Sequence, residues 1–382
     1  MSLAMQQLLI SWILIGILLL PADRVGTLQA IIGLPAVLIM LLGGAIADSG
    51  DLRRSLIQVY MIAAILPLYL AGVTLYGELN IATVLPWGFG MGVAIAYSMP
   101  AQQALLNRVS RNRLQQAVSI AMGIGFVVQV IGLAIAGQLD LIGLPIVLGF
   151  QSICLVIAAV SLLKLETNYC GSRNVKIKPW RAIVEGFQAT RRQEVLFHVL
   201  AISALSSLLN AGSFYTVLPF IIKRLYEGTA VTLSTAMIVF FSGALVSSMV
   251  MYKVMPLEHP GRAFLMMQLT RVIVLILLWT EPSWWLFVVT CGAWGVNMGM
   301  SSTLARAIVQ ESAPPLYVGR IMSVFTLGLL GSIPIGAAIL GLVIEWAGTT
   351  NALIPAIIWS ILMFCYGRFA TQIWAYQSPK PN

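Results

Sequence analysis

Residues 87–92 read Trp-Gly-Phe-Gly-Met-Gly, and residues 294–299 read Trp-Gly-Val-Asn-Met-Gly. The two stretches lie 207 residues apart and share four of their six residues. Each of them lies inside a long apolar run, and a fixed internal period of this kind indicates a repeated architecture. The sequence therefore predicts two halves that have the same order of elements.

Apolar runs, bounded by polar residues, Gly or Pro, extend outward from both stretches. Of the 382 residues, 59% are apolar and only 9% are charged, whereas an ordinary soluble domain carries roughly 25% charged residues. A transmembrane helix needs about 20 apolar residues. The runs lie at 3–20, 27–47, 56–76, 81–99, 115–137, 144–164, 195–222, 230–252, 263–280, 285–303, 318–342 and 350–370. We therefore predict an all-α polytopic membrane protein with twelve transmembrane helices in two six-helix pseudo-repeats, which excludes a water-soluble enzyme or a disordered chain.

Lysine and arginine residues gather in alternate loops between these runs. The chain has 22 Lys and Arg against 13 Asp and Glu. If the central loop is cytoplasmic, 18 of the 22 lie inside, Arg24, Lys223 and Arg224 lie outside, and Arg271 lies within a run. The positive-inside rule therefore predicts a cytoplasmic central loop and C-terminus. This distribution accounts for the basic charge, so no nucleic-acid partner is needed.

A polar, basic stretch divides the chain into its two predicted halves. We predict an N-terminal six-helix bundle over 1–164, a cytoplasmic linker over 165–194, a C-terminal six-helix bundle over 195–370 and a cytoplasmic tail over 371–382. The sequence has no HExxH, GxSxG or GxxxxGK[ST] pattern, and its two histidines are far apart. It therefore predicts no catalytic residues, no metal site, no cofactor and no ATP-driven step.

The loop after the second apolar run reads Gly-Ala-Ile-Ala-Asp-Ser-Gly-Asp-Leu-Arg-Arg. It resembles the Gly-x-x-x-Asp-Arg-x-Gly-Arg-Arg signature of the major facilitator superfamily. The resemblance implies that Gly44, Asp48, Arg53 and Arg54 form a latch that holds one conformation and releases in the other. Two departures are that Ser49 stands where Arg is usual and that the basic pair comes one residue late. The alternative is a positive-inside stop after a helical hairpin.

A second motif reads Ser-Met-Pro-Ala-Gln-Gln-Ala-Leu-Leu at 98–106 and Leu-Gln-Gln-Ala at 114–117. It resembles a pattern of the superfamily branch that contains enterobactin-type siderophore exporters and macrolide efflux proteins, and Val-Leu-Pro at 217–219 also fits that branch. The resemblance implies a monomeric secondary transporter in the bacterial inner membrane. It would export a siderophore-like or drug-like small molecule by alternating access, coupled to protons.

Two features depart from the pattern of this branch. The first span of its members usually begins some 20 residues earlier, so Met1 falls inside the expected first helix and that helix is shortened. A misassigned start codon is one explanation, and a non-transporting truncated homologue is another. The Gly-Pro pair of many drug antiporters is also absent from 132–137. Translocation of a lipid or lysophospholipid therefore stays open as an alternative.

Arg271 is the single charge at the middle of a predicted span. An Arg at the bilayer centre costs about 2.5–3.5 kcal/mol on insertion scales, so such a residue faces a cavity or a partner. Gln268, three residues earlier, shares its helix face. We expect Arg271 to line the substrate pathway and to attract an anionic group. The alternative is a structural pairing with another helix.

Other residues within the spans are isolated polar side chains and small residues. Gln129, Asn210 and Asn297 either line the pathway or hydrogen-bond to a neighbouring helix at roughly 0.6 kcal/mol each. The sequence predicts helix packing or hinge positions at Gly88, Gly92, Pro100, Gly295 and Gly299. No carboxylate falls in the middle of a span, so proton coupling depends on the resemblance alone.

Overall fold

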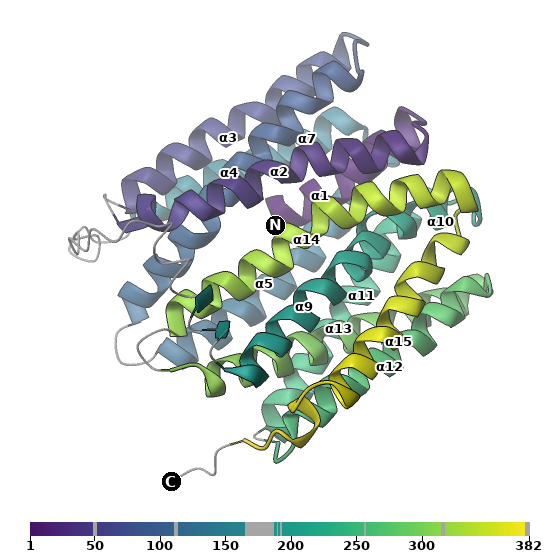
Figure 1. Ribbon diagram of the computed structural model, residues 1–382. Helices are drawn as coiled ribbons and strands as arrows, with labels where there is room; N and C mark the ends of the chain where they lie inside the picture. Colours follow the sequence, from purple (N-terminus) through teal and green to yellow (C-terminus); the bar gives the residue numbers. More distant parts are fainter. Residues whose placement is uncertain are drawn as a thin grey trace. The chain divides into compact units, whose positions relative to one another are not determined.

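The computed structural model describes residues 1–48, 52–110, 114–164, 187–188, 190–191, 193–255, 257–314 and 318–378 (Figure 1). Within these ranges every regular element is a helix. The all-helical prediction is therefore confirmed.

Each predicted apolar run falls on a helix of the structure. The first six fall on α1 (Ser2–Trp12) with the π-helical turn Ile13–Ile17, α2 (Ala22–Asp48), α3 (Leu52–Leu75), α4 (Ile81–Ser110), α5 (Leu114–Gly137) and α7 (Leu144–Leu163), with the short α6 (Leu139–Ile142) before α7. The last six fall on α9 (Glu194–Gly212), which continues through the π-helical turn Ser213–Val217 into α10 (Leu218–Arg224), then on α11 (Ala230–Val254), α12 (Pro260–Trp279), α13 (Trp284–Ser312), α14 (Val318–Ala347) and α15 (Ile354–Phe369). Among the described residues, nine helices are long and apolar enough to cross a membrane. The chain is thus polytopic, and the count of twelve spans stays a prediction.

The chain divides into two compact units. Unit 1 comprises Met1–Leu19, Leu28–Arg181 and Thr229–Ser234, and unit 2 comprises Leu20–Thr27, Ala182–Gly228 and Thr235–Asn382. Two helices therefore contribute to both units, because α2 begins in unit 2 and α11 begins in unit 1. The domain boundaries predicted from the sequence stay a prediction.

In unit 1, α3 packs against α4 and α7, as Figure 1 shows. A hydrogen bond also joins α7 to α3, because the Ser152 hydroxyl donates to the Ala64 carbonyl oxygen at 2.7 Å. Helix α4 approaches α2 at two glycines. A Cβ on Gly88 would meet the Ile32 side chain, and a Cβ on Gly92 would meet the Ile32 carbonyl oxygen. Both positions therefore require a residue without a side chain for this close helix contact.

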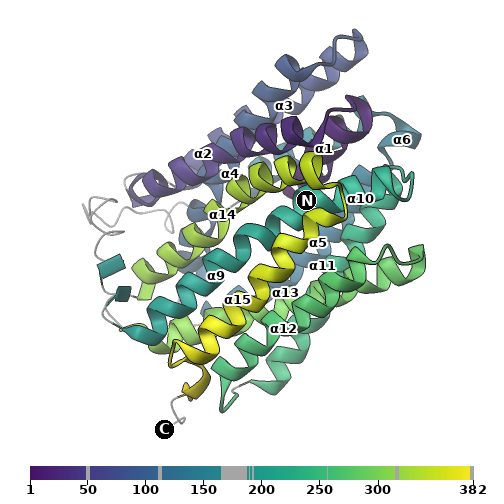
Figure 2. The same ribbon diagram turned by 45° about the vertical axis from the view of Figure 1, so that its right-hand side comes forward.

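In unit 2, α9 packs along α14, and α12 packs between α13 and α15 (Figure 2). Helix α13 approaches α11 at Gly295 and Gly299, where a Cβ would meet the backbone of Phe240 and Ala244 respectively. These glycines follow Gly88 and Gly92 by the 207-residue repeat. The sequence repeat is therefore also a repeat of helix packing, within unit 1 and again within unit 2.

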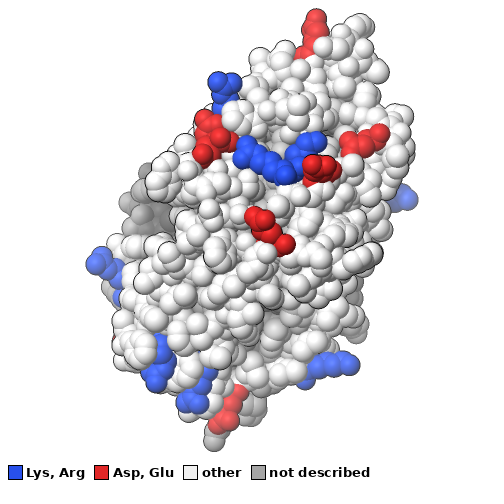
Figure 3. Space-filling model, turned by 90° about the vertical axis from the view of Figure 1, so that its right-hand side faces the viewer, with Lys and Arg blue, Asp and Glu red and all other residues white. Residues whose placement is uncertain are grey.

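The outer surfaces of the helices are apolar. Large apolar side chains are exposed along nearly every long helix, and most of the face shown in Figure 3 carries no charged side chain. Near the helix ends, Trp346 is 91% exposed, Tyr76 86% and Trp285 78%. Aromatic residues at helix ends are typical of the interface between lipid and water. This surface therefore suits a lipid environment.

Candidate functional site

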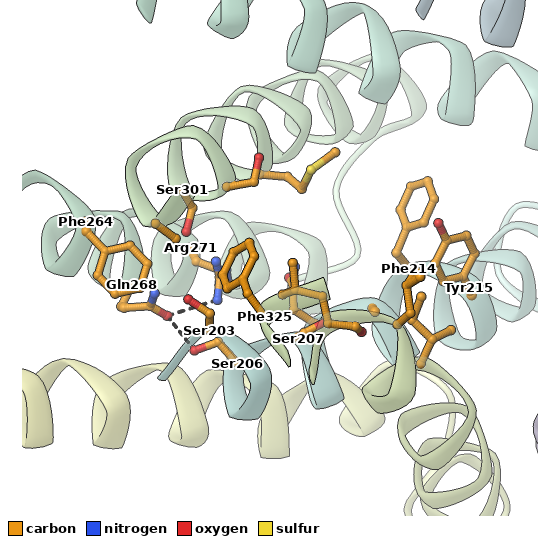
Figure 4. Close-up of a pocket in the computed structure, with 18 of the residues that line it drawn as sticks. Ser203, Ser206, Ser207, Phe214, Tyr215, Phe264, Gln268, Arg271, Ser301 and Phe325 are labelled. Carbon is orange, nitrogen blue, oxygen red and sulfur yellow. Dashed lines mark hydrogen bonds between the residues drawn. The ribbon is translucent and has the colours of Figure 1, made fainter. Parts of the chain in front are cut away.

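Unit 2 contains a cavity of about 220 Å³ among α9, α11, α12, α13 and α14 (Figure 4). Its polar lining comes largely from one stripe of α9, which carries Ser203, Ser206, Ser207 and Asn210. These residues are spaced i, i+3, i+4 and i+7, so a single helix face presents them all. Of this stripe, only Asn210 was predicted as a pathway residue from the sequence; the three serines were not, although the helical spacing was available there.

Arg271 of α12 lies at the polar end of this cavity and is only 4% exposed. Its Nη1 donates to Oε1 of Gln268 at 2.9 Å, and its Nε donates to Oδ1 of Asn297 at 3.3 Å. Gln268 precedes Arg271 by three residues and therefore shares its face of α12. In the part of the chain that the structure describes, Arg271 forms no ion pair with a carboxylate.

Asn297 connects α13 to α12 behind the guanidinium group. Its Nδ2 donates to the Met267 carbonyl oxygen at 2.8 Å and to Oγ1 of Thr270 at 2.7 Å. These two hydrogen bonds direct the amide oxygen of Asn297 toward Arg271. Asn297 therefore orients the arginine from behind, and the cavity is lined by Arg271 itself and by Gln268.

Two hydrogen-bond donors at this end have no partner among the described residues. Oε1 of Gln268 accepts from both Arg271 and the Ser206 hydroxyl, the latter at 3.0 Å. Nε2 of Gln268 and the hydroxyl of Ser203 are buried without a partner. A buried polar group without a partner costs about 1–3 kcal/mol. This corner is therefore incomplete as a hydrogen-bonding site.

The other end of the cavity is aromatic, with Phe214 and Tyr215 at the right of Figure 4. The rings of Phe214 and Phe240 stack with 4.1 Å between centroids, and Trp294 meets Phe214 edge-on at 5.7 Å. Nε1 of Trp294 donates to Oδ1 of Asn210 at 2.8 Å. The cavity thus has a cationic, donor-rich end, where Phe264 and Phe325 also lie, and an apolar end formed by further aromatic rings.

The remaining predicted pathway and latch residues belong to unit 1 and are not among the residues that line this cavity. Gln129 is half-buried on α5 in unit 1. Gly44 and Asp48 lie in α2, and Pro100 lies in α4; the side chains of all three lie outside the described residues. The structure therefore brings together Arg271, Gln268, Asn210 and Asn297 within unit 2, whereas Gln129 belongs to unit 1.

Arg53 of the predicted latch contacts the end of a neighbouring helix. Its Nε donates to the Leu162 carbonyl oxygen at 2.8 Å and its Nη2 to the Leu163 carbonyl oxygen at 2.6 Å. The last carbonyl groups of a helix have no partner within that helix, and a cation is favourable there. Arg53 therefore caps the C-terminus of α7, while its neighbour Arg54 is exposed.

No group of three or more His, Cys, Asp or Glu residues that could hold a metal ion occurs in the described ranges. The cavity lining consists of hydroxyl, amide, guanidinium, aromatic and aliphatic groups. Such a lining can bind and orient a small organic molecule.

Comparisons with known proteins agree with this architecture. A model of the family described as transmembrane secretion effector matches residues 1–373. The chain is 24% identical to macrolide efflux protein A of Streptococcus pyogenes over 311 residues, covering 79% of this chain and 75% of that protein. It is 26% identical to the staphyloferrin A transporter of Staphylococcus aureus over 229 residues, covering 58% of this chain and 56% of that protein.

Solved structures of transporters share the fold. The nucleoside transporter NupG superposes with a TM-score of 0.72 at 11% identity, covering 98% of this chain and 97% of that one. At this identity the likeness concerns the fold alone. It matches the order and packing of the helices described above.

Proposed function

The chain belongs to the transmembrane secretion effector family, a branch of the major facilitator superfamily of transporters, and we propose that it exports a small organic molecule by alternating access. The family and the relatives above are transporters rather than enzymes. Two of these relatives are named for a macrolide and for staphyloferrin A, which supports a drug-like or siderophore-like substrate.

The observation that carries this proposal is the cavity beside Arg271. It lies between long apolar helices, and the guanidinium group is buried with no carboxylate beside it among the described residues. Intramembrane charges are expensive and mark substrate or ion pathways. A bipolar cavity at this depth gives an amphipathic molecule a binding place between the two sides of the membrane.

We place the protein in the bacterial inner membrane, acting as a monomer. The Lys and Arg distribution supports a cytoplasmic central loop and C-terminus. The latch of Gly44, Asp48, Arg53 and Arg54 belongs to the same proposal, with the α7 cap formed by Arg53 as its support. Gly88, Gly92, Pro100, Gly295 and Gly299 serve as packing or hinge positions, which the close helix contacts at the four glycines support.

Proton coupling completes the proposal and rests on the superfamily resemblance. The cavity lining contains Ser, Asn, Gln and Arg but no carboxylate among the described residues. Dissipating the proton gradient with an uncoupler should stop export in intact cells. Continued export in the presence of the uncoupler would contradict proton coupling. It would not contradict the proposal that the protein is an exporter.

The function is tested by comparing metabolites inside and outside cells. The strains carry a deleted gene, the restored gene, or the restored gene with Arg271→Leu, and grow with little iron and with ample iron. A compound that accumulates inside the deletion strain and returns to the medium on restoration identifies the substrate. We expect Arg271→Leu to behave like the deletion while the protein reaches the membrane. Unchanged metabolites together with unchanged sensitivity to antimicrobials would contradict export.

A further inference from the structure

We infer that the cavity of unit 2 binds the carboxylate of a small amphipathic monoanion with an aromatic or apolar body, and that it discriminates against cationic amines. This inference rests on the proposed export function and names the chemical class of its substrate. Three features of the cavity support it: a fixed positive charge, a set of unused donors, and an aromatic end.

The positive charge beside the cavity is not neutralised. An arginine side chain remains protonated in proteins, and Arg271 is 4% exposed. Its two contacts are the neutral amide oxygens of Gln268 and Asn297. Amide oxygens solvate a cation but do not cancel its charge, and a buried charge without a counter-ion is strongly unfavourable. One negative charge is enough to neutralise this guanidinium group, and a ligand that is a monoanion supplies it.

The unused hydrogen-bonding groups at this end favour an acceptor. A guanidinium group has five N–H donors, and Arg271 uses two of them on described residues. Nε2 of Gln268 and the Ser203 hydroxyl are also buried without partners. Figure 4 shows these groups around the same corner of the cavity. An ionised carboxylate only accepts hydrogen bonds, whereas an ammonium group only donates them and is repelled by Arg271.

The opposite end of the cavity determines the body of the ligand. Phe214, Tyr215, Phe240 and Phe241 line it, and Phe214 and Phe240 are stacked. Aromatic rings pack favourably in such surroundings. The cavity of about 220 Å³ has room for an acidic head group and about one ring of such a ligand.

A matched series of three probes tests the charge preference. Purified full-length protein in detergent binds radiolabelled 4-phenylbutyrate at about pH 7, where the acid is ionised. Unlabelled 4-phenylbutyramide and 4-phenylbutylamine compete, and they differ from the acid only in the head group. We expect the amide and the amine to bind about ten-fold or more weakly than the carboxylate. Equal binding of the three, or no binding of the carboxylate, overturns the inference.

The variant Gln268→Glu tests the assigned residues with the least change in shape. It places a carboxylate where Oε1 now lies, 2.9 Å from Nη1 of Arg271, and it converts the unused Nε2 donor into an acceptor. The internal counter-ion should compete with the ligand, so 4-phenylbutyrate binding should fall about ten-fold or more. Arg271→Gln should cause the same loss. Arg24→Gln, at an exposed position, is the control and should bind as the unaltered protein does.

The outcomes separate this inference from the proposed function. Full 4-phenylbutyrate binding by Gln268→Glu overturns the assignment of the site, whether or not the cells export a metabolite. Carboxylate binding that Gln268→Glu abolishes, in a protein whose deletion changes no metabolite, supports the site and contradicts export. Export of a cationic compound at an unchanged rate by Gln268→Glu contradicts the carboxylate preference and leaves export in place.

Discussion

The carboxylate of Asp140 accepts a hydrogen bond from the backbone N–H of Ala230, the first residue of α11, with 2.7 Å between Oδ2 and N. Within unit 2, Oε1 of Glu345 accepts from the backbone N–H of Ala22, the first residue of α2, at 2.6 Å. The first N–H groups of a helix lack partners in the helix and carry its positive dipole end. Asp140 and Glu345 lie 205 residues apart, close to the 207-residue repeat. The repeat therefore extends to two helix caps supplied by distant residues.

Removing the Asp140 carboxylate should lower the stability of the protein. Asp140→Ala leaves the first N–H of α11 without its acceptor, and loss of an N-cap costs about 1 kcal/mol. The midpoint of thermal unfolding in detergent should fall accordingly. Glu78→Ala is the control, because Glu78 is an exposed loop carboxylate and should leave the midpoint unchanged. Equal midpoints for the two variants would show that the cap contributes nothing.

Replacing Glu345 should lower the stability of the protein more than replacing its ion-pair partner, Arg224. Nη2 of Arg224 lies 3.1 Å from Oε1 of Glu345, and both side chains are substantially exposed at 42% and 38%. An exposed ion pair contributes about 0–1 kcal/mol and is screened by salt. Glu345→Ala also removes the cap of α2, so it should lower the unfolding midpoint more than Arg224→Ala does. The difference should persist in high salt; if it disappears there, the ion pair and not the cap carries the effect.

Gly295→Ala should be destabilising, although alanine favours helices. The added Cβ would meet the backbone of Phe240 on α11, and overpacking of this kind costs about 1–3 kcal/mol. Gly149→Ala in α7 is the matched control, because a Cβ there meets nothing within 4 Å. That variant should be neutral or more stable by up to about 1 kcal/mol. Thermal unfolding of the two purified variants gives the comparison, and a fall for both would contradict a specific contact at Gly295.

The hydrogen bond between Trp294 and Asn210 should show coupling in a double-mutant cycle. Trp294 is 1% exposed, and Asn210 accepts from its indole. Asn210→Leu leaves a buried N–H without a partner, at a cost of about 1–3 kcal/mol. Adding Trp294→Phe removes that N–H, so the double variant should lose less stability than the two single losses combined. Simple additivity in thermal unfolding would mean that the hydrogen bond is not a source of stability.

Arg53→Met should lower both stability and transport. It removes the donors to the last carbonyl groups of α7, each of which contributes about 1 kcal/mol. If the proposed latch is correct, transport should fall further than the amount of folded protein in the membrane. Arg24→Met, at an exposed position outside the proposed latch, is the control in the same export assay and should leave transport unchanged. Transport that follows protein abundance alone would assign Arg53 a purely structural role.

Much of the fold could be predicted from the sequence, because lipid imposes a simple pattern on it. A backbone in lipid must satisfy its hydrogen bonds internally, so each apolar run of sufficient length becomes a helix. Arg271 could be identified as a candidate site residue for the same reason, because a charged side chain at the middle of a transmembrane helix is unfavourable in lipid. Gln268 followed from helical spacing. The hydrogen bond between Arg271 and Asn297 depends on the packing of α12 against α13, which the sequence does not encode as a local pattern.

The helix caps and the aromatic end of the cavity could not be predicted. Asp140 and Ala230 are 90 residues apart, and Glu345 and Ala22 are 323 apart. Such contacts arise only after the helices have packed. Phe214 lies in the π-helical turn Ser213–Val217, and no local sequence pattern there marks it as the lining of a cavity.

The sharing of α2 and α11 between the units has a consequence for biogenesis. Proteins with several domains generally fold from the N-terminus, one domain after another, as the chain leaves the ribosome. Here unit 1 includes Thr229–Ser234, which are synthesised after all its other residues, and Leu20–Thr27 belong to a unit that otherwise begins at Ala182. The partner of Ala22, Glu345, is translated 323 residues after it. Unit 1 therefore cannot finish packing before residues 229–234 have been synthesised, and the first turn of α2 waits for Glu345.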